Sequence, residues 1–96
     1  MEEVLFIREK DFKSKREALS YIASELDFPS YFGKNLDALF DCLAEMDEPV
    51  FIALDPVPTD DSKEWYQKIC EVISDAAAEN ENIIVLCRAD DIEAVL

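Results

Sequence analysis

The sequence contains no histidine, and this absence bears on every catalytic interpretation. Histidine is the commonest general base, the usual activator of serine and cysteine nucleophiles, and a frequent zinc ligand. Three cysteines are present, Cys42, Cys70 and Cys87, but their odd number and long separations show neither a disulfide framework nor a paired metal-ligand spacing. We therefore predict reduced, mostly buried thiols, no cofactor and no enzymatic activity.

Basic residues are also scarce. The chain has 9 lysines and arginines against 23 aspartates and glutamates, which gives a formal net charge of −14. Such a charge disfavours nucleic acid and anionic membranes as partners and indicates a basic protein partner. The alternative is that the charge only keeps a small protein soluble.

Long apolar runs are missing, so no signal peptide or membrane span is visible and we predict a cytoplasmic protein. Half of the 96 residues are nevertheless apolar, which is enough to form one core. We expect residues 1–96 to form a single domain.

Three short apolar runs do not alternate with polar residues, which is typical of buried parallel strands. They are Val4–Ile7, Val50–Leu54 and Ile83–Cys87. Helical patterns lie between them, two before the second run and one after it. The order strand, helix, helix, strand, helix, strand predicts an α/β fold with a small three-stranded parallel sheet and three to four helices.

The ends of the helices are marked by capping residues. Ser14 and Glu17 form a capping-box pattern for the first helix, which we expect to end at residues 27–29. Asn35 is the expected cap of the second helix. The third helix is predicted to start among four capable caps at residues 59–62 and to run to about Glu79.

The second helix separates two kinds of side chain. At 100° per residue, its core stripe is Leu36, Leu39, Leu43 and Met46. Asp37 and Asp41 share the opposite strip, with Phe40 on the border between the two. Like charges four residues apart slightly destabilise a helix, so folding alone does not explain Asp41.

Gly33, the only glycine, precedes this helix in a short loop with Tyr31 and Phe32. A lone glycine there predicts a positive φ or a close backbone approach, within what would otherwise be a simple turn between helices. Together the loop and the two aspartates form an aromatic and acidic patch suited to a cationic cleft.

The run PSYFGKNLDALFDCL, followed within a few residues by Glu48-Pro49-Val50, resembles the barstar family of intracellular inhibitors of barnase-like ribonucleases. The resemblance implies a barstar-like fold and an inhibitor, or immunity protein, that blocks the active site of a basic ribonuclease in a 1:1 heterodimer. The family prototype has tryptophan at the positions of Phe40 and Met46 and tyrosine at that of Phe32, so the identity of the partner stays open.

In this family the helix and its preceding loop plug the active site of the ribonuclease, with aspartates in place of substrate phosphates. The resemblance makes Asp41 the main phosphate mimic and Asp37 its companion, and alignment of the last strand adds Asp75 on the third helix. The implied contact positions are Tyr31, Phe32, Gly33, Asn35, Asp37, Phe40, Asp41 and Asp75.

Two other functions are compatible with the residues. Acidic pairs such as Asp37 with Asp41, Asp60 with Asp61, or Asp90 with Asp91 could hold Mg²⁺ in an enzyme, although adjacent aspartates are more often helix caps and no phosphate loop accompanies them. An acidic adaptor of the same fold that binds another basic protein is the main alternative to inhibition.

Overall fold

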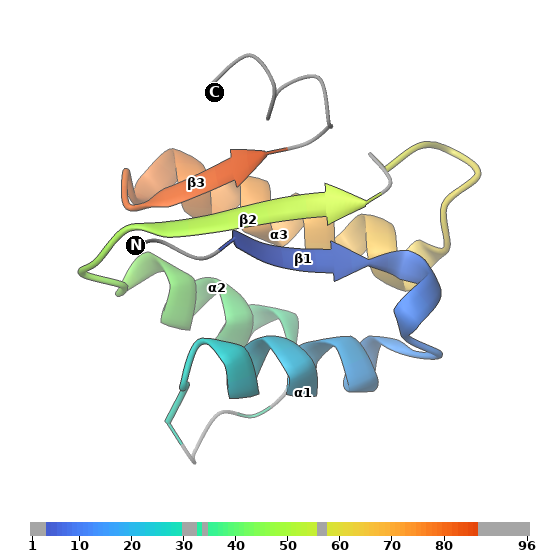
Figure 1. Ribbon diagram of the computed structural model, residues 1–96, viewed down its shortest axis with the longest axis horizontal. Coiled ribbons are helices and arrows are strands. Elements are labelled where there is room, and N and C mark those ends of the chain that lie inside the picture. Colours follow the sequence, from blue (N-terminus) through green and yellow to red (C-terminus); the bar gives the residue numbers. More distant parts are fainter. Residues whose placement is uncertain (1–3, 30–32, 34, 56–57, 87–96) are drawn as a thin grey trace.

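The computed structural model describes residues 4–29, 33, 35–55 and 58–86. Its elements follow the predicted order, with one added 3-10 turn (Figure 1). They are β1 (Val4–Arg8), η1 (Glu9–Asp11), α1 (Lys15–Glu25), α2 (Leu36–Ala44), β2 (Val50–Asp55), α3 (Glu64–Glu79) and β3 (Ile83–Leu86). Cys87, which we had placed in the last strand, lies outside the described residues.

The three strands form one sheet in the order β1-β2-β3, and both pairings are parallel. Ile7 pairs with Leu54, and Ile52 with Val85. Parallel neighbours need long crossovers, and here α1 with α2 provide the first while α3 provides the second. The predicted α/β class and parallel sheet are therefore confirmed.

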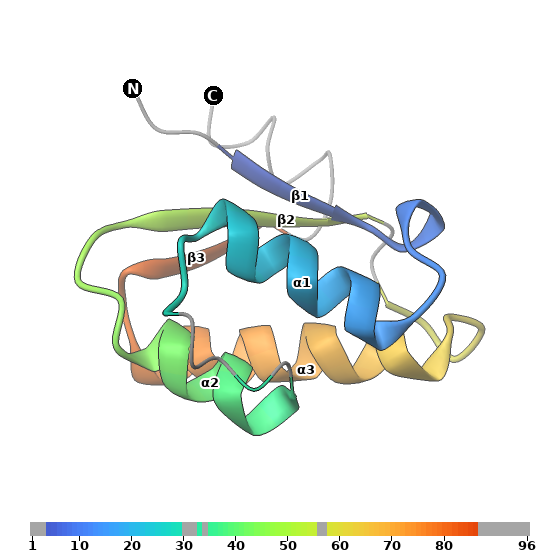
Figure 2. The ribbon, with the colours of Figure 1, turned by 90° about the horizontal axis from the view of Figure 1, so that it is seen from below.

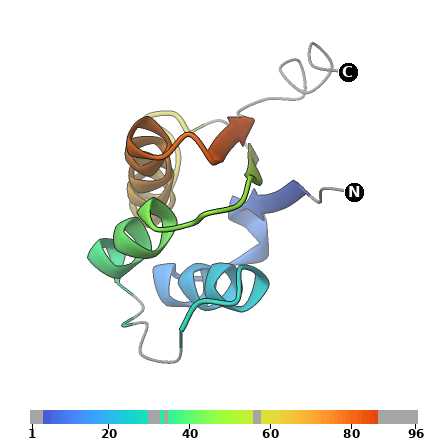
Figure 3. The same cartoon turned by 90° about the vertical axis from the view of Figure 1, so that its left-hand side faces the viewer.

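The three α-helices lie on the same side of the sheet, so the described elements form two layers (Figures 2 and 3). Strand β1 consequently alternates, with Leu5 and Ile7 buried while Val4 and Phe6 are 36% and 38% exposed. Our expectation that this run is buried throughout was wrong. Its continuous apolar sequence hid a period of two, because the outward-facing positions are apolar as well.

The core lies between the sheet and the helices. Every α-helix contributes side chains with no exposed surface, among them Leu19 of α1, Leu39 of α2 and Ile73 of α3. Among the helices, α2 packs most extensively against α3. In the described part of the chain, every helix is too short or too polar to cross a membrane.

The first helix begins and ends by local hydrogen bonds. The Glu17 amide donates to Oγ of Ser14 at 3.3 Å, and the Lys13 amide donates to Oε1 of Glu17 at 3.4 Å, which confirms the predicted start. At the other end Asp27 adopts a positive φ of 55°, and the Phe28 amide donates to the Ala23 carbonyl. This Schellman ending usually uses glycine, so here an aspartate makes the left-handed turn.

The start of α3 differs from our prediction. The helix begins at Glu64 after Lys63, and no side chain at residues 59–62 caps it. Those residues instead form a turn of their own, in which the Thr59 amide donates to Oγ of Ser62 at 2.9 Å. The capping-type side chains satisfy the loop backbone rather than the helix, since both uses involve the same local hydrogen bonds.

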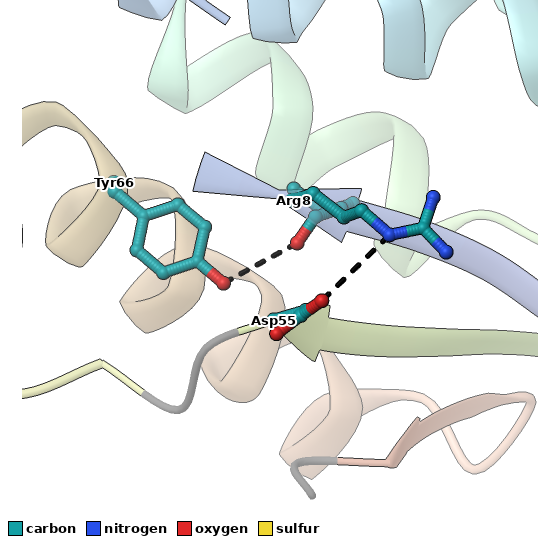
Figure 4. Close-up of polar contacts among 4 residues, drawn as sticks. Arg8, Asp55 and Tyr66 are labelled. Atoms are coloured by element: carbon teal, nitrogen blue, oxygen red, sulfur yellow. Dashed lines mark hydrogen bonds and ion pairs between the residues drawn. The ribbon is translucent and has the colours of Figure 1, made fainter. Parts of the chain in front are cut away.

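Helical spacing in the sequence predicts that the core face of α3 consists of Trp65, Ile69, Val72, Ile73 and Ala76. Tyr66 is not in this set, yet its side chain is fully buried. Its hydroxyl donates to the Ile7 carbonyl at 3.3 Å, near the end of the sheet where Arg8 Nε lies 3.7 Å from Asp55 Oδ2 (Figure 4). The ion pair is exposed and contributes little, whereas the buried phenol both packs and hydrogen-bonds.

Burial, together with the neighbouring Cys70, raises the pKa of the Tyr66 hydroxyl well above its ordinary value. The folded protein therefore keeps this proton where the unfolded chain, with a pKa of about 10, loses it. The resulting contribution to stability is constant below about pH 10 and falls above it, by up to about 1.4 kcal/mol per pH unit.

We expect Tyr66→Phe to cost about 1 kcal/mol near neutral pH, the usual worth of one hydrogen bond. Above pH 10 the variant should lose stability less steeply than the wild type, because it has no buried proton to release. Urea unfolding between pH 8 and 11 measures both effects. Parallel curves for the two proteins would show that Tyr66 does not govern alkaline stability.

Candidate functional site

Helix α2 starts where the sequence predicts. The Ala38 amide donates to Oδ1 of Asn35 at 2.8 Å, so Asn35 is the cap that begins the helix. This hydrogen bond fixes the position of the first turn, which carries Asp37. The local sequence therefore sets both the start of the helix and the direction in which its side chains point.

The two faces of α2 also agree with the helical spacing. Leu39 and Leu43 are fully buried, whereas Asp37 and Asp41 are exposed. Phe40 is partly buried and packs against the core at the border between these faces. The apolar stripe thus holds the helix on the protein while the two carboxylates, one turn apart, point to solvent.

Gly33 shows the second of the two features predicted for it, a close approach, and not the first. It has no positive φ. A side-chain carbon at this position would instead lie 2.9 Å from Nδ2 of Asn35, closer than such atoms approach. Glycine therefore leaves room for the amide that caps α2, which corresponds to the close approach given as the second possibility.

The other predicted contact residues are distributed unevenly. Tyr31 and Phe32 lie outside the described residues. Asp75 is exposed on α3, the helix against which α2 packs. The structure thus gathers Gly33, Asn35, Asp37, Phe40 and Asp41 on α2 and its approach, with Asp75 on the adjacent helix. Their role in binding a partner stays a prediction.

The charged residues of α2 are not arranged to stabilise the helix itself. Its last turn has no basic residue, and Asp41 and Glu45 lie near the negative end of the helix dipole. Among the described residues, the ion pair within 4 Å joins Arg8 at the end of β1 to Asp55 at the end of β2. Within the described residues, neither Asp37 nor Asp41 forms an ion pair within 4 Å.

The cysteine next to Asp41 is not activated as a nucleophile. Burial first, and then the charges of Glu45 and Asp41, raise the pKa of the Cys42 thiol, which disfavours the nucleophilic thiolate. Cys42 and Cys70 stand as thiols rather than disulfide partners, while Cys87 lies outside the described residues.

Metal binding has no visible support within the described ranges. No group of three or more histidine, cysteine, aspartate or glutamate residues is placed there to hold a metal ion. Neither Asp37 with Asp41 nor Asp60 with Asp61 therefore has a third such residue placed beside it within these ranges. The pair Asp90 and Asp91 lies outside the described residues.

Sequence reasoning missed two asparagines that hold the end of α2. Nδ2 of Asn80 lies 2.9, 3.2 and 2.9 Å from the carbonyl oxygens of Leu43, Ala44 and Met46. Nδ2 of Asn82 donates to the same Met46 carbonyl at 3.1 Å. The only sequence signal was an asparagine-rich helix end, which normally indicates a local turn rather than a contact 34–37 residues away.

Comparison with known proteins shows which family the chain resembles. The family described as Barstar (barnase inhibitor) matches residues 2–90. A protein of Bacillus subtilis (strain 168), named "Putative ribonuclease inhibitor YrdF", is 39% identical to the chain over 51 residues. That match covers 52% of this chain and 56% of the relative, so it spans little more than half of either.

Proposed function

We propose that this chain, which belongs to the barstar family, inhibits a basic ribonuclease by covering its active site with α2 and the loop before it. In this proposal Asp41 and Asp37 occupy the places of substrate phosphates, and Asp75 on α3 adds a further acidic contact. The complex is a 1:1 heterodimer formed in the cytoplasm, as expected of an immunity protein.

The observation that carries the proposal is the pair of exposed aspartates on a helix anchored by fully buried leucines. Two carboxylates one turn apart gain little for the fold, yet they match the spacing at which a cationic cleft can pair with both. A nuclease that binds RNA phosphates presents such a cleft. Blocking this cleft requires only a surface of complementary shape and charge, so an inhibitor needs no activated nucleophile beside α2.

The decisive experiment is to titrate the purified chain into basic secreted ribonucleases of the barnase type while RNA cleavage is measured. We expect cleavage to stop at one equivalent of inhibitor. The rate of association should fall as salt rises from 0.05 to about 0.5 M, because screening weakens the attraction between oppositely charged surfaces.

Capture on immobilised chain distinguishes the acidic adaptor. A basic protein that is retained by α2, is released by Asp41→Ala and has no ribonuclease activity would support the adaptor and contradict inhibition. Cleavage of RNA by the chain itself with added Mg²⁺, lost in Asp37→Asn, would instead show an enzyme. Retention of an active ribonuclease whose activity is then suppressed supports the proposal.

A further inference from the structure

We propose that Asn80 is a positioning residue for the inhibitory face, holding the end of α2 against α3 so that Asp41 has one fixed placement in the free protein. This inference rests on the proposed function. It assigns to the turn between α3 and β3 a part in partner binding, although that turn need not touch the partner.

The orientation of the Asn80 side chain is fixed by its own neighbours. Its Oδ1 accepts a hydrogen bond from the Asn82 amide at 3.0 Å, so the amide nitrogen must face the other way, toward α2. The Asn80 backbone is held as well, because its amide donates to the Ala76 carbonyl at 2.8 Å and its carbonyl accepts from the Ile83 amide at 3.0 Å. Asn80 is therefore held in place by hydrogen bonds to both α3 and β3.

Two of the three carbonyls that Asn80 meets have a second donor, which is the Met46 amide for Leu43 and Nδ2 of Asn82 for Met46. The Glu45 amide donates to the Asp41 carbonyl and the Met46 amide donates to the Leu43 carbonyl, and these hydrogen bonds close the last turn. Beyond that turn the Ala44 and Met46 carbonyls face Nδ2 of Asn80. Leaving such groups unsatisfied is costly, so the amide stabilises one conformation of the segment that follows Asp41.

A neutral amide suits this position better than a cation would. Lysine or arginine near the end of a helix can donate to its last carbonyls, and its charge also interacts favourably with the dipole. A positive charge here would lie at the C-terminal end of α2 and would weaken the negative potential offered to a basic partner. Asparagine supplies the donors without that charge.

The same turn also connects to the sheet. The Asn82 carbonyl accepts from the Val50 amide at 2.7 Å, at the start of β2. One short turn therefore joins the end of α2, the end of α3 and the beginnings of β2 and β3. Fixing a binding helix in its bound position before association reduces the ordering cost of binding.

The test compares two side-chain amides at opposite ends of α3, Asn80 just after its last residue and Gln67 in its first turn. In Asn80→Asp a carboxylate replaces the donor beside three carbonyl oxygens. The matched control is Gln67→Glu, because Nε2 of Gln67 likewise donates to two carbonyls, those of Thr59 at 2.9 Å and Ser62 at 2.8 Å, but at the opposite end of α3. Both substitutions change the net charge equally, and Asn80→Ala repeats the test without a new charge.

We expect each Asn80 variant to raise the Kd for the inhibited ribonuclease about tenfold, mainly through faster dissociation, and Gln67→Glu to change it less than about twofold. In the free protein, hydrogen exchange at the Glu45 and Met46 amides should accelerate in the Asn80 variants alone. A loss of general stability would affect both ends of α3, so this contrast separates positioning from a merely structural role.

Two results would overturn the proposed role of Asn80. One is equal affinity of Asn80→Ala and Gln67→Glu for the ribonuclease, and the other is unchanged hydrogen exchange at the Glu45 and Met46 amides. Failure of the wild type to inhibit any ribonuclease would overturn the proposed function instead. Exchange in the free chain then still decides whether Asn80 fixes the end of α2, so the two failures are distinguishable.

Discussion

Replacing Asp41 by alanine is expected to raise the Kd for the inhibited ribonuclease about 30-fold or more, which corresponds to about 2 kcal/mol, the usual lower limit for a binding hot spot. The free energy of unfolding should stay unchanged or rise slightly. Asp37→Ala should act in the same direction. Affinity and stability thus change separately, which is the signature of residues kept for binding.

The physical reason is a change of environment on association. In the free chain Asp41 is exposed near the negative end of α2, where it gains nothing from the dipole and is repelled by Asp37. In the complex the same carboxylate is desolvated and paired with cations. Removing it then leaves buried positive charges on the partner without a counter-charge, which is costly.

Glu25→Ala is the matched control, since Glu25 is exposed at the end of α1 and carries the same charge. Glu17 is unsuitable because its side chain takes part in the cap of α1. Calorimetric melting and inhibition assays on the three variants measure both quantities. If Asp37→Ala and Asp41→Ala bind as tightly as Glu25→Ala, the inhibitory surface lies elsewhere on the molecule.

The candidate site could be predicted closely where its geometry is local. Asn35 lies three residues from the amide that it caps, and the apolar stripe through Leu39 and Leu43 follows directly from the helical period. The strand order along the chain is likewise set by short apolar runs. These features depend on neighbours in sequence, so spacing and residue type suffice to find them.

Features that depend on distant contacts could not be read in this way. Tyr66 is adjacent to the predicted face of α3, and only the nearby Ile7 carbonyl shows why a tyrosine is buried there. In the sequence Asn80 looks like an ordinary turn residue, and only the structure shows its hydrogen bonds to the end of α2. The exposed positions of β1 are apolar, so no polar residue revealed that none of the described helices covers one side of the sheet. Gly33 was recognised as special, but its crowding against Asn35 required coordinates.

A large loss of stability is expected for Leu39→Ala on α2. Leu39 is fully buried where α2 meets the core, so truncation removes packing and leaves a cavity that its neighbours fill only in part. Such changes cost about 2–5 kcal/mol. For a chain of this size, 3 kcal/mol lowers the melting temperature by about 12–24 °C.

Leu36→Ala is the control for this prediction, because Leu36 belongs to the same apolar stripe but is only partly buried at the first turn. It should lose clearly less stability, since less surface returns to water and the site can relax toward solvent. Equal melting temperatures for the two variants would contradict the anchoring of α2 through Leu39.

At a low temperature where Leu39→Ala remains folded, Asp37 and Asp41 still project from the same helix, so the Kd of Leu39→Ala for the ribonuclease should change less than that of Asp41→Ala. One face of α2 would then determine whether the protein folds, and the opposite face whether it binds.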